Sequence, residues 1–173
     1  MSEWKMLTLI GQDKPGIVAK ITTALYDAQA QLGEASMMRL GGNFTIMLMV
    51  KSEKSADELE VIIKPVADEM HLTSTCQTIQ ASLHQHEIPD FNIVVYGADR
   101  PGIVAKATTH LLDAGFNITD LESDVGGEES DPIYIMRIEG TSAGGQAALE
   151  KAISQIKQDG VNVDMISIDT LIA

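Results

Sequence analysis

The sequence predicts an α+β fold in which one β-α-β-β-α-β unit occurs twice. The first observation is a repeat: GQDKPGIVAK at Gly11–Lys20 returns as GADRPGIVAK at Gly97–Lys106, 86 residues later. The second is that short apolar runs alternate with amphipathic segments in the same order in both halves. This order is typical of the ferredoxin-like fold, an antiparallel four-stranded sheet with two helices on one face. Two long copies indicate a duplicated domain rather than a solenoid.

The repeat divides the 173 residues into two domains. We expect the first domain at residues 1–82 and the second at residues 91–173. The segment between them, residues 83–90, is polar and contains Pro89, which predicts a short linker.

In the first copy, the apolar run Leu7–Ile10 ends at Gly11 and predicts a buried strand. A helix is expected to follow Pro15, because proline suits the first helical turn, and to end near Gly33. The apolar positions of this helix share one face: Ile17, Ile21, Ala24, Leu25 and Ala28.

Two strands then follow in the first copy, Ala35–Leu40 and Phe44–Val50, joined at Gly41-Gly42-Asn43 by a tight hairpin turn. A second helix has its apolar face at Ala56, Leu59, Ile63, Val66 and Met70. Pro65 should kink or shorten this helix. The last strand is expected at Leu72–Ile79.

The second copy repeats these elements. Its strands are expected at Phe91–Tyr96, Ile118–Val125, Ile133–Ile138 and Val161–Ile168. The two middle strands are joined by a longer connection, Gly126–Pro132. Its helices have apolar faces at Ile103, Ala107, Leu111 and Ala114, and at Leu149, Ala152, Ile153 and Ile156, and the first ends near Gly115.

The composition argues against several classes of partner. The formal net charge is −13, and the few basic residues are scattered, so we expect no direct nucleic-acid binding and no attraction to an anionic membrane. No run of 18 apolar residues predicts a membrane span. The single Cys76 excludes an internal disulfide, fits a cytoplasmic protein and is expected to be buried. The strand methionines Met37, Met38, Met47, Met49 and Met136 are expected to fill the cores.

The turn between the first strand and first helix of each copy is the candidate site. Helix N-termini carry orphan N–H donors and partial positive charge, so they accept carboxylates and phosphates. Gly16 and Gly102 would let a ligand approach the backbone. The acidic pair Asp13 and Asp99 could hold an ammonium group, and the basic pair Lys14 and Arg100 could meet a carboxylate. A small amino acid has both charges.

An alternative is that the turn has only a structural role. Asp13 would then cap the helix, and the Pro-Gly pair would serve the turn geometry. A phosphate-binding loop is a poor match, because Ile17 and Val18 stand where its Lys and Ser or Thr belong.

Other candidate chemistry is weaker. His84 and His86 could ligate a metal, but solvated linker histidines are the preferred interpretation, and His71 and His110 are isolated. A calcium site is not favoured, because the acidic residues near one hairpin tip miss the EF-hand spacing; these are Asp124, Glu128, Glu129 and Asp131. No histidine has a neighbouring acid in a plausible turn, so no catalytic group assembles and we expect no enzyme.

The motif Asp-(Lys/Arg)-Pro-Gly-Ile-Val after a strand, within this element order, resembles the ACT domain, a regulatory module of amino-acid metabolism. The resemblance implies an effector site in the strand-to-helix loops and at an Asn-Ile pair entering the second strand. In this sequence the implied residues are Asp13, Lys14, Pro15, Gly16, Ile17, Asp99, Arg100, Pro101, Gly102, Ile103, Asn117 and Ile118. The first copy has Gln31-Leu32 in place of Asn-Ile, which favours the second copy as the binding one.

The resemblance also implies what the protein does. We expect a cytoplasmic regulator that senses a small amino acid, with glycine or serine favoured, and needs no cofactor. It would act by contact with a regulatory protein such as a transcription activator, and its ACT domains would pair, with a homodimer expected. The alternative is an interaction module that senses nothing and scaffolds a metabolic enzyme.

Overall fold

The computed structural model describes residues 3–80, 87–98, 101–128 and 131–168. The chain divides into two compact units, Met1–Gln85 and His86–Ala173, each described here by itself. The division falls inside the segment 83–90. Within that segment, Asp90 is hydrogen-bonded to the second unit: its backbone N–H donates to the carbonyl oxygen of Gly140, with 2.9 Å between nitrogen and oxygen.

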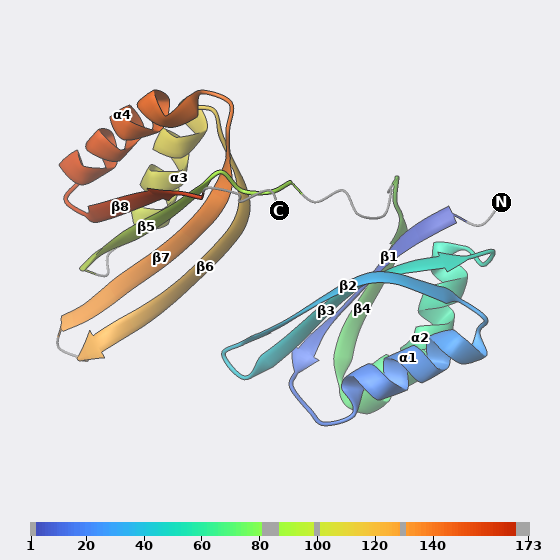
Figure 1. Ribbon diagram of the computed structural model, residues 1–173. Helices are drawn as coiled ribbons and strands as arrows, with labels where there is room; N and C mark the ends of the chain where they lie inside the picture. Colours follow the sequence, from blue (N-terminus) through green and yellow to red (C-terminus); the bar gives the residue numbers. More distant parts are fainter. Residues whose placement is uncertain (1–2, 81–86, 99–100, 129–130, 169–173) are drawn as a thin grey trace. The chain divides into compact units, whose positions relative to one another are not determined.

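The first unit has the predicted order β-α-β-β-α-β. Its elements are β1 (Glu3–Gln12), α1 (Ile17–Asp27), β2 (Gln31–Leu40), β3 (Asn43–Ser52), α2 (Ala56–Met70) and β4 (Leu72–Thr78). The sheet has strand order β2-β3-β1-β4, and every neighbouring pair is antiparallel. Figure 1 shows both helices on the same face of this sheet.

The second unit repeats this topology. Its elements are β5 (Phe91–Ala98), α3 (Ile103–Asp113), β6 (Phe116–Glu128), β7 (Asp131–Ser142), α4 (Gly145–Gln158) and β8 (Asn162–Ser167). The strand order is β6-β7-β5-β8, again antiparallel throughout. The predicted α+β class, with two four-stranded antiparallel sheets each covered by two helices on one face, is therefore confirmed (Figure 1).

Each unit has its own core between sheet and helices. In the first, alternate residues of β1 such as Leu7 and Leu9 pack against Leu25 and Leu59, all fully buried. The second core has fully buried members from the same kinds of element: Ile93, Val95, Ala107, Leu111, Met136, Ile138 and Leu149. Cys76 is buried as expected. The strand period of two and the helix period near 3.6 thus place the predicted apolar faces inward.

The hairpin turn was predicted correctly, but the ends of two other connections were not. Leu40 pairs with Asn43, and both Gly41 and Gly42 have positive φ, as a type I′ turn requires. Gly33 does not end α1; it lies inside β2, at a break in the register with β3. The expected connection over residues 126–132 is also wrong, because β6 and β7 stay paired as far as Glu128 and Asp131.

Two smaller expectations need correction. Pro65 does not shorten α2, which runs on to Met70, and the expected alternative, a kink, stays a prediction. The carbonyl that Pro65 leaves without a helical partner belongs to Val61, which is exposed, so water can take that bond. Met136 lies in the second core as expected, whereas Met49 is buried but lies outside the first core. The remaining three of the five predicted methionines are about half exposed: Met37, Met38 and Met47.

Met47 illustrates why that expectation failed. It lies on β3 between the buried residues Ile46 and Leu48, so its side chain points to the sheet face that the helices leave uncovered. Ile10 is exposed on the same face.

Candidate functional site

The two repeated turns have nearly the same backbone conformation. Gly16 precedes α1 with φ 90° and Gly102 precedes α3 with φ 93°, both in the left-handed region that glycine tolerates best. No side chain caps either helix in the described part of the chain. The alternative in which Asp13 caps α1 is therefore wrong. Asp99 and Arg100, the second copy's charged candidates, lie outside the described residues.

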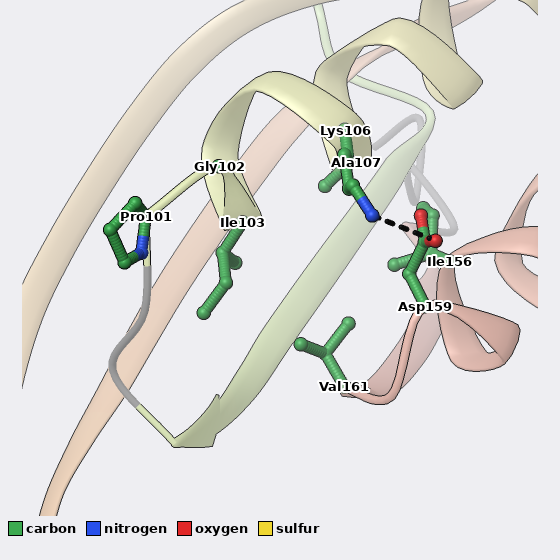
Figure 2. A pocket seen from close by; sticks show the side chains of 8 residues that line it. All are labelled: Pro101, Gly102, Ile103, Lys106, Ala107, Ile156, Asp159 and Val161. Atoms are coloured by element: carbon green, nitrogen blue, oxygen red, sulfur yellow. Dashed lines mark hydrogen bonds and ion pairs between the residues drawn. The ribbon is translucent and has the colours of Figure 1, made fainter.

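A cavity of about 210 Å³ lies beside the turn of the second unit (Figure 2). We call it the α3–α4 cavity; it is lined by Pro101, Gly102, Ile103, Lys106, Ala107, Ile156, Asp159 and Val161. Lys106 and Asp159 are the charged residues of this lining. Figure 2 shows the Lys106 side chain directed at the Asp159 carboxylate, with 3.1 Å between Nζ and Oδ1.

The duplication allows two lining residues of this cavity to be compared with their counterparts in the first unit. Ala107 stands where the first unit has Ile21, and both are fully buried. Val161 stands beside Gly97, as Leu72 is paired with Gly11 in the first unit. Each replacement in the second unit is the smaller residue, so carbon atoms that fill the first unit at these positions are missing from the second. The second unit thus has the smaller residue at both of these matched positions.

The ion pair at the cavity is itself duplicated. Lys20 pairs with Glu69 between α1 and the end of α2, as Lys106 pairs with Asp159 between α3 and the end of α4. The second unit adds His110, whose Nε2 lies 3.2 Å from Asp159 Oδ2. Hydrogen bonds from Lys106 and from His110 lower the pKa of the Asp159 carboxyl. Asp159 is therefore a carboxylate at neutral pH.

The turn of the first unit lines a different and wider pocket, of about 340 Å³, toward the hairpin strands β2 and β3. Its lining consists of four predicted site residues, two of their neighbours on α1 and three strand residues: Asp13, Lys14, Gly16, Ile17, Val18, Ala19, Met37, Arg39 and Phe44. Asp13 forms an ion pair with Arg39. Its charge is thus balanced by a strand arginine that the sequence analysis did not single out.

The structure does not bring Asn117 and Ile118 to the turn of their own unit. Gly102 precedes α3, whereas both residues enter β6 after α3 has ended. The 11 residues of α3 separate the two places by about 16 Å along the helix axis. The Asn117 amide instead donates to Glu87 over 2.9 Å. Within the second unit, the Gly102 turn and the pair Asn117 and Ile118 therefore do not line one site.

Sequence reasoning missed the residues that come from the far helix, above all Asp159 and His110. The expectation concerned acids in the same turn as a histidine and did not cover His110 and Asp159, which are 49 residues apart in the chain but 3.2 Å apart in space. A signal was present: Glu69 and Asp159 each lie three residues after a matched apolar position, Val66 and Ile156, and Lys20 and Lys106 match in the repeat. The matching lysines and acids could have predicted both pairs.

The remaining candidates gain no support. Within the described residues, no group of three or more His, Cys, Asp or Glu side chains could hold a metal ion. His84, His86 and Glu129 lie outside those residues. Among the helices that the structure describes, none combines the length and apolar character needed to cross a membrane.

Comparison with protein families identifies both halves. A family model described as ACT domain matches residues 6–77, and a second model with the same description matches residues 91–160. Among curated proteins, residues of this chain are 38% identical over 50 positions to the UPF0237 protein YjhC of Lactococcus lactis subsp. lactis (strain IL1403). That match spans 29% of this chain and 58% of the relative, little more than half of its length.

Two solved structures resemble the whole chain. A protein of unknown function from Galdieria sulphuraria has a TM-score of 0.75 at 20% identity, covering 97% of this chain and 99% of that one. A protein described as a candidate glycine cleavage system transcriptional repressor has a TM-score of 0.65 at 15% identity, with the same coverage of both chains. At these identities the likeness establishes the fold alone.

Proposed function

The chain belongs to the ACT-domain family, with two ACT domains in tandem, and from this premise we propose that it is a regulatory protein that binds a small amino acid in its second domain. The observation that carries the proposal is the α3–α4 cavity beside the Gly102 turn. It adjoins the turn at which the sequence predicted an effector.

The charges around the turn suit a zwitterion. The first N–H groups of α3 and the Lys106 ammonium would attract a carboxylate, and the Asp159 carboxylate would attract an ammonium group. Gly102 has no Cβ, so a ligand can reach the backbone there. Of the two domains, we favour the second because its turn adjoins the more enclosed space.

We further propose that the signal leaves by protein contact. One protein of the same fold is described as a candidate glycine cleavage system transcriptional repressor, which supports a role in restraining a transcription factor of that metabolism. The net charge of −13 argues against direct DNA binding. In a homodimer, paired ACT domains could adopt two arrangements. The effector would favour the arrangement that it binds more tightly, and the size of the shift would be set by the difference between its two affinities.

A second candidate function is an interaction module without a ligand. The observation in its favour is the uncovered sheet face of the first unit, where Ile10, Met38 and Met47 are about half exposed. Apolar side chains gathered on one face are typical of a contact surface for another protein.

A thermal-stability screen of the full chain against the common amino acids separates the two functions. A ligand that binds only the folded state raises the unfolding temperature with its concentration. A sensor shows such a rise with at least one amino acid, saturating as the site fills. An interaction module shows none at millimolar concentrations, and that result would remove the sensing proposal.

A further inference from the structure

We infer that the outer edge of β4 and the groove between β4 and α2 bind a basic, extended segment of a partner protein, which adds to the first sheet as a further strand. That the signal leaves by protein contact is part of the proposed function, on which this inference rests. The surface that makes the contact and the chemistry of the segment that binds there are new.

A groove of about 480 Å³ lies beside α2 and the start of β4. We call it the α2–β4 groove; it is lined by Asp57, Glu60, Val61, Lys64, Ala67, Asp68, Leu72, Thr73 and Ser74. Ala67 and Leu72 are the buried members of this lining, and the others are exposed or half-buried. A partner can therefore touch the outer side of α2, which is mostly polar, and the edge of β4.

The edge of β4 carries backbone groups that face outward. β4 is the last strand in the order β2-β3-β1-β4, so no described strand pairs with its outer side. The Cys76 N–H donates to the Glu60 side chain on α2, although Cys76 is the register partner of Leu7 on β1. Opposite residues of antiparallel strands alternate between hydrogen-bonded and non-hydrogen-bonded pairs. The N–H and C=O of Ser74, two residues before Cys76, therefore face outward as well.

An outward-facing edge is a template for one more strand. Glu60 protects one end of it by accepting from the Cys76 N–H, whereas Thr73 and Ser74 border the α2–β4 groove. An extended peptide can pair its main chain with Ser74 and place alternate side chains against α2. The strand edge thus favours an extended peptide over a helix or a small molecule.

The charges of the α2–β4 groove decide which peptide fits. Asp57, Glu60 and Asp68 are acidic, and Lys64 is the basic residue of the lining. Lys64 Nζ lies 3.1 Å from Asp68 Oδ1, so its charge is already balanced within α2. The acidic excess attracts lysine and arginine side chains and repels a second copy of this chain, whose net charge is −13. Proteins that bind DNA carry basic segments, so a transcription factor is a suitable partner.

The second unit provides the internal comparison. Leu59 of α2 and Leu149 of α4 are matched, fully buried residues and align the two helices. In this alignment Asp57, Val61 and Asp68 correspond to Ala147, Lys151 and Gln158. Glu150 corresponds to Glu60, but it accepts from Gln146 on its own helix. The acidic lining therefore belongs to the first unit, and binding of the basic segment is assigned to that unit.

NMR titration of the full chain with short peptides tests the inference. The probe is Thr-Lys-Val-Lys-Val-Lys-Thr, acetylated and amidated at its ends, and the control peptide has glutamate in place of lysine. We expect the lysine peptide to cause saturable amide shifts at Thr73, Ser74 and Val61, which weaken as salt is raised. The glutamate peptide should cause none. Shifts centred on β2, β6 or β8, or no saturable shift at millimolar lysine peptide, would overturn the inference.

Backbone methylation of the probe separates strand addition from attraction between charges alone. The N–H groups of alternate residues in an extended peptide point to opposite sides, so either the valine or the lysine N–H groups face β4. We expect N-methylation of one set to weaken binding at least about fivefold and N-methylation of the other set to have little effect. Equal affinities for the two methylated peptides would contradict strand addition.

Variants of the chain test the residues of the groove. Asp68→Asn removes one carboxylate of the lining, and Asp27→Asn makes the same change at an exposed position at the end of α1. We expect Asp68→Asn to weaken the lysine peptide about two- to fivefold, as loss of an exposed charge pair does, and Asp27→Asn to have a smaller effect. Equal effects of the two variants would count against the groove.

Ser74→Pro tests the strand edge itself. It removes the outward N–H, and an edge strand tolerates proline where the N–H faces away from the sheet. Binding of the lysine peptide should be lost, and normal binding by this variant would refute strand addition at β4. Should Ser74→Pro lose its cooperative melting transition, the methylated peptides and Asp68→Asn decide.

The peptide titration and the amino-acid screen fail independently. If the lysine peptide does not bind at the α2–β4 groove, this inference is wrong, and the thermal-stability screen still decides whether the chain senses an amino acid. If the screen finds no amino acid and the peptide binds as expected, the sensing proposal is wrong and the contact surface stands.

Discussion

His110 Nε2 lies 3.2 Å from Asp159 Oδ2, which joins the last turn of α3 to the residue that caps the end of α4. The same carboxylate also accepts from Lys106. Asp159 therefore connects two basic side chains of one helix to the end of the next. In the first unit, Ala24 occupies the place of His110, so this threefold cluster belongs to the second unit.

The cluster predicts a pH dependence of stability. Hydrogen bonds from Lys106 and His110 lower the pKa of Asp159 in the folded state below the ordinary value of 3.8. The resulting stabilisation is present above that ordinary value and is lost as the pH falls through the folded-state pKa. We expect Asp159→Asn to be less stable than the natural chain at pH 7, and the difference to shrink as the pH approaches 3.

Urea unfolding followed by circular dichroism at several pH values measures this effect. Lys64→Ala is the control variant for loss of an ion pair in general. It removes an exposed ion pair within α2 of the first unit and leaves Asp159 unchanged. A difference between Asp159→Asn and the natural chain that stays constant from pH 7 to 3 would contradict the assignment.

Gly11 and Gly97 are matched by the repeat but differ in their surroundings. A Cβ on Gly11 would lie 2.7 Å from the carbonyl oxygen of His71 and 2.8 Å from Leu72 Cδ2. On Gly97 the nearest atom is Val161 Cγ1, at an ordinary 3.5 Å. We therefore expect Gly11→Ala to cost about 1–3 kcal/mol and Gly97→Ala to cost much less.

Trp4 is the single tryptophan and lies on β1, so its fluorescence reports the unfolding of the first unit. The midpoint of that fluorescence transition should fall in Gly11→Ala. The stability of Gly97→Ala is followed by circular dichroism. Equal losses of stability in Gly11→Ala and Gly97→Ala would show that the close contact at Gly11 does not affect stability.

The conformation of Gly102 predicts a cost of a different kind. At φ 93° an added Cβ has open space around it, so any loss of stability in Gly102→Ala comes from backbone strain alone. We expect about 1–2 kcal/mol. Gly126→Ala is the control, since Gly126 also has open space but no positive φ. Thermal unfolding measures both; a Gly102→Ala variant as stable as Gly126→Ala would contradict the argument.

The fold was largely predictable because its signals are local. Alternation and helical spacing placed Leu7, Leu25 and Leu59 in one core, and the Gly-Gly turn fixed one hairpin. Strand ends were less predictable: Gly126 and Gly127 carry turn chemistry, yet pairing across the hairpin extends the strands through them. Tertiary pairing outweighed local preference there.

The candidate site was only half predictable. The motif located the turn at Gly102, but the residues that complete the cavity come from the end of α4 and the start of β8. Spacing along the chain does not encode such contacts. The second unit has Ala107 at the position of Ile21. How this smaller residue packs depends on the opposite helix, and the position of that helix is known only from the three-dimensional structure.

The charge of the chain predicts its behaviour with DNA. With a net charge of −13, binding to promoter DNA should be no better than non-specific at physiological salt. A mobility-shift assay with candidate promoters measures this, with and without a DNA-binding partner protein. Loss or displacement of the partner's complex would agree with the proposed function, whereas tight sequence-specific binding by this chain alone would refute it.

The most direct test of the central claim is NMR mapping of amide shifts in the full chain on addition of glycine, L-serine, L-valine or L-leucine. The account predicts saturable shifts at the start of α3, at Gly102 and Ile103, and near Asp159 and Val161. The matching turn of the first unit, at Gly16 and Ile17, should remain unchanged. Shifts confined to the Gly16 turn, or no saturable shift at up to millimolar valine, leucine, glycine and serine, would contradict it.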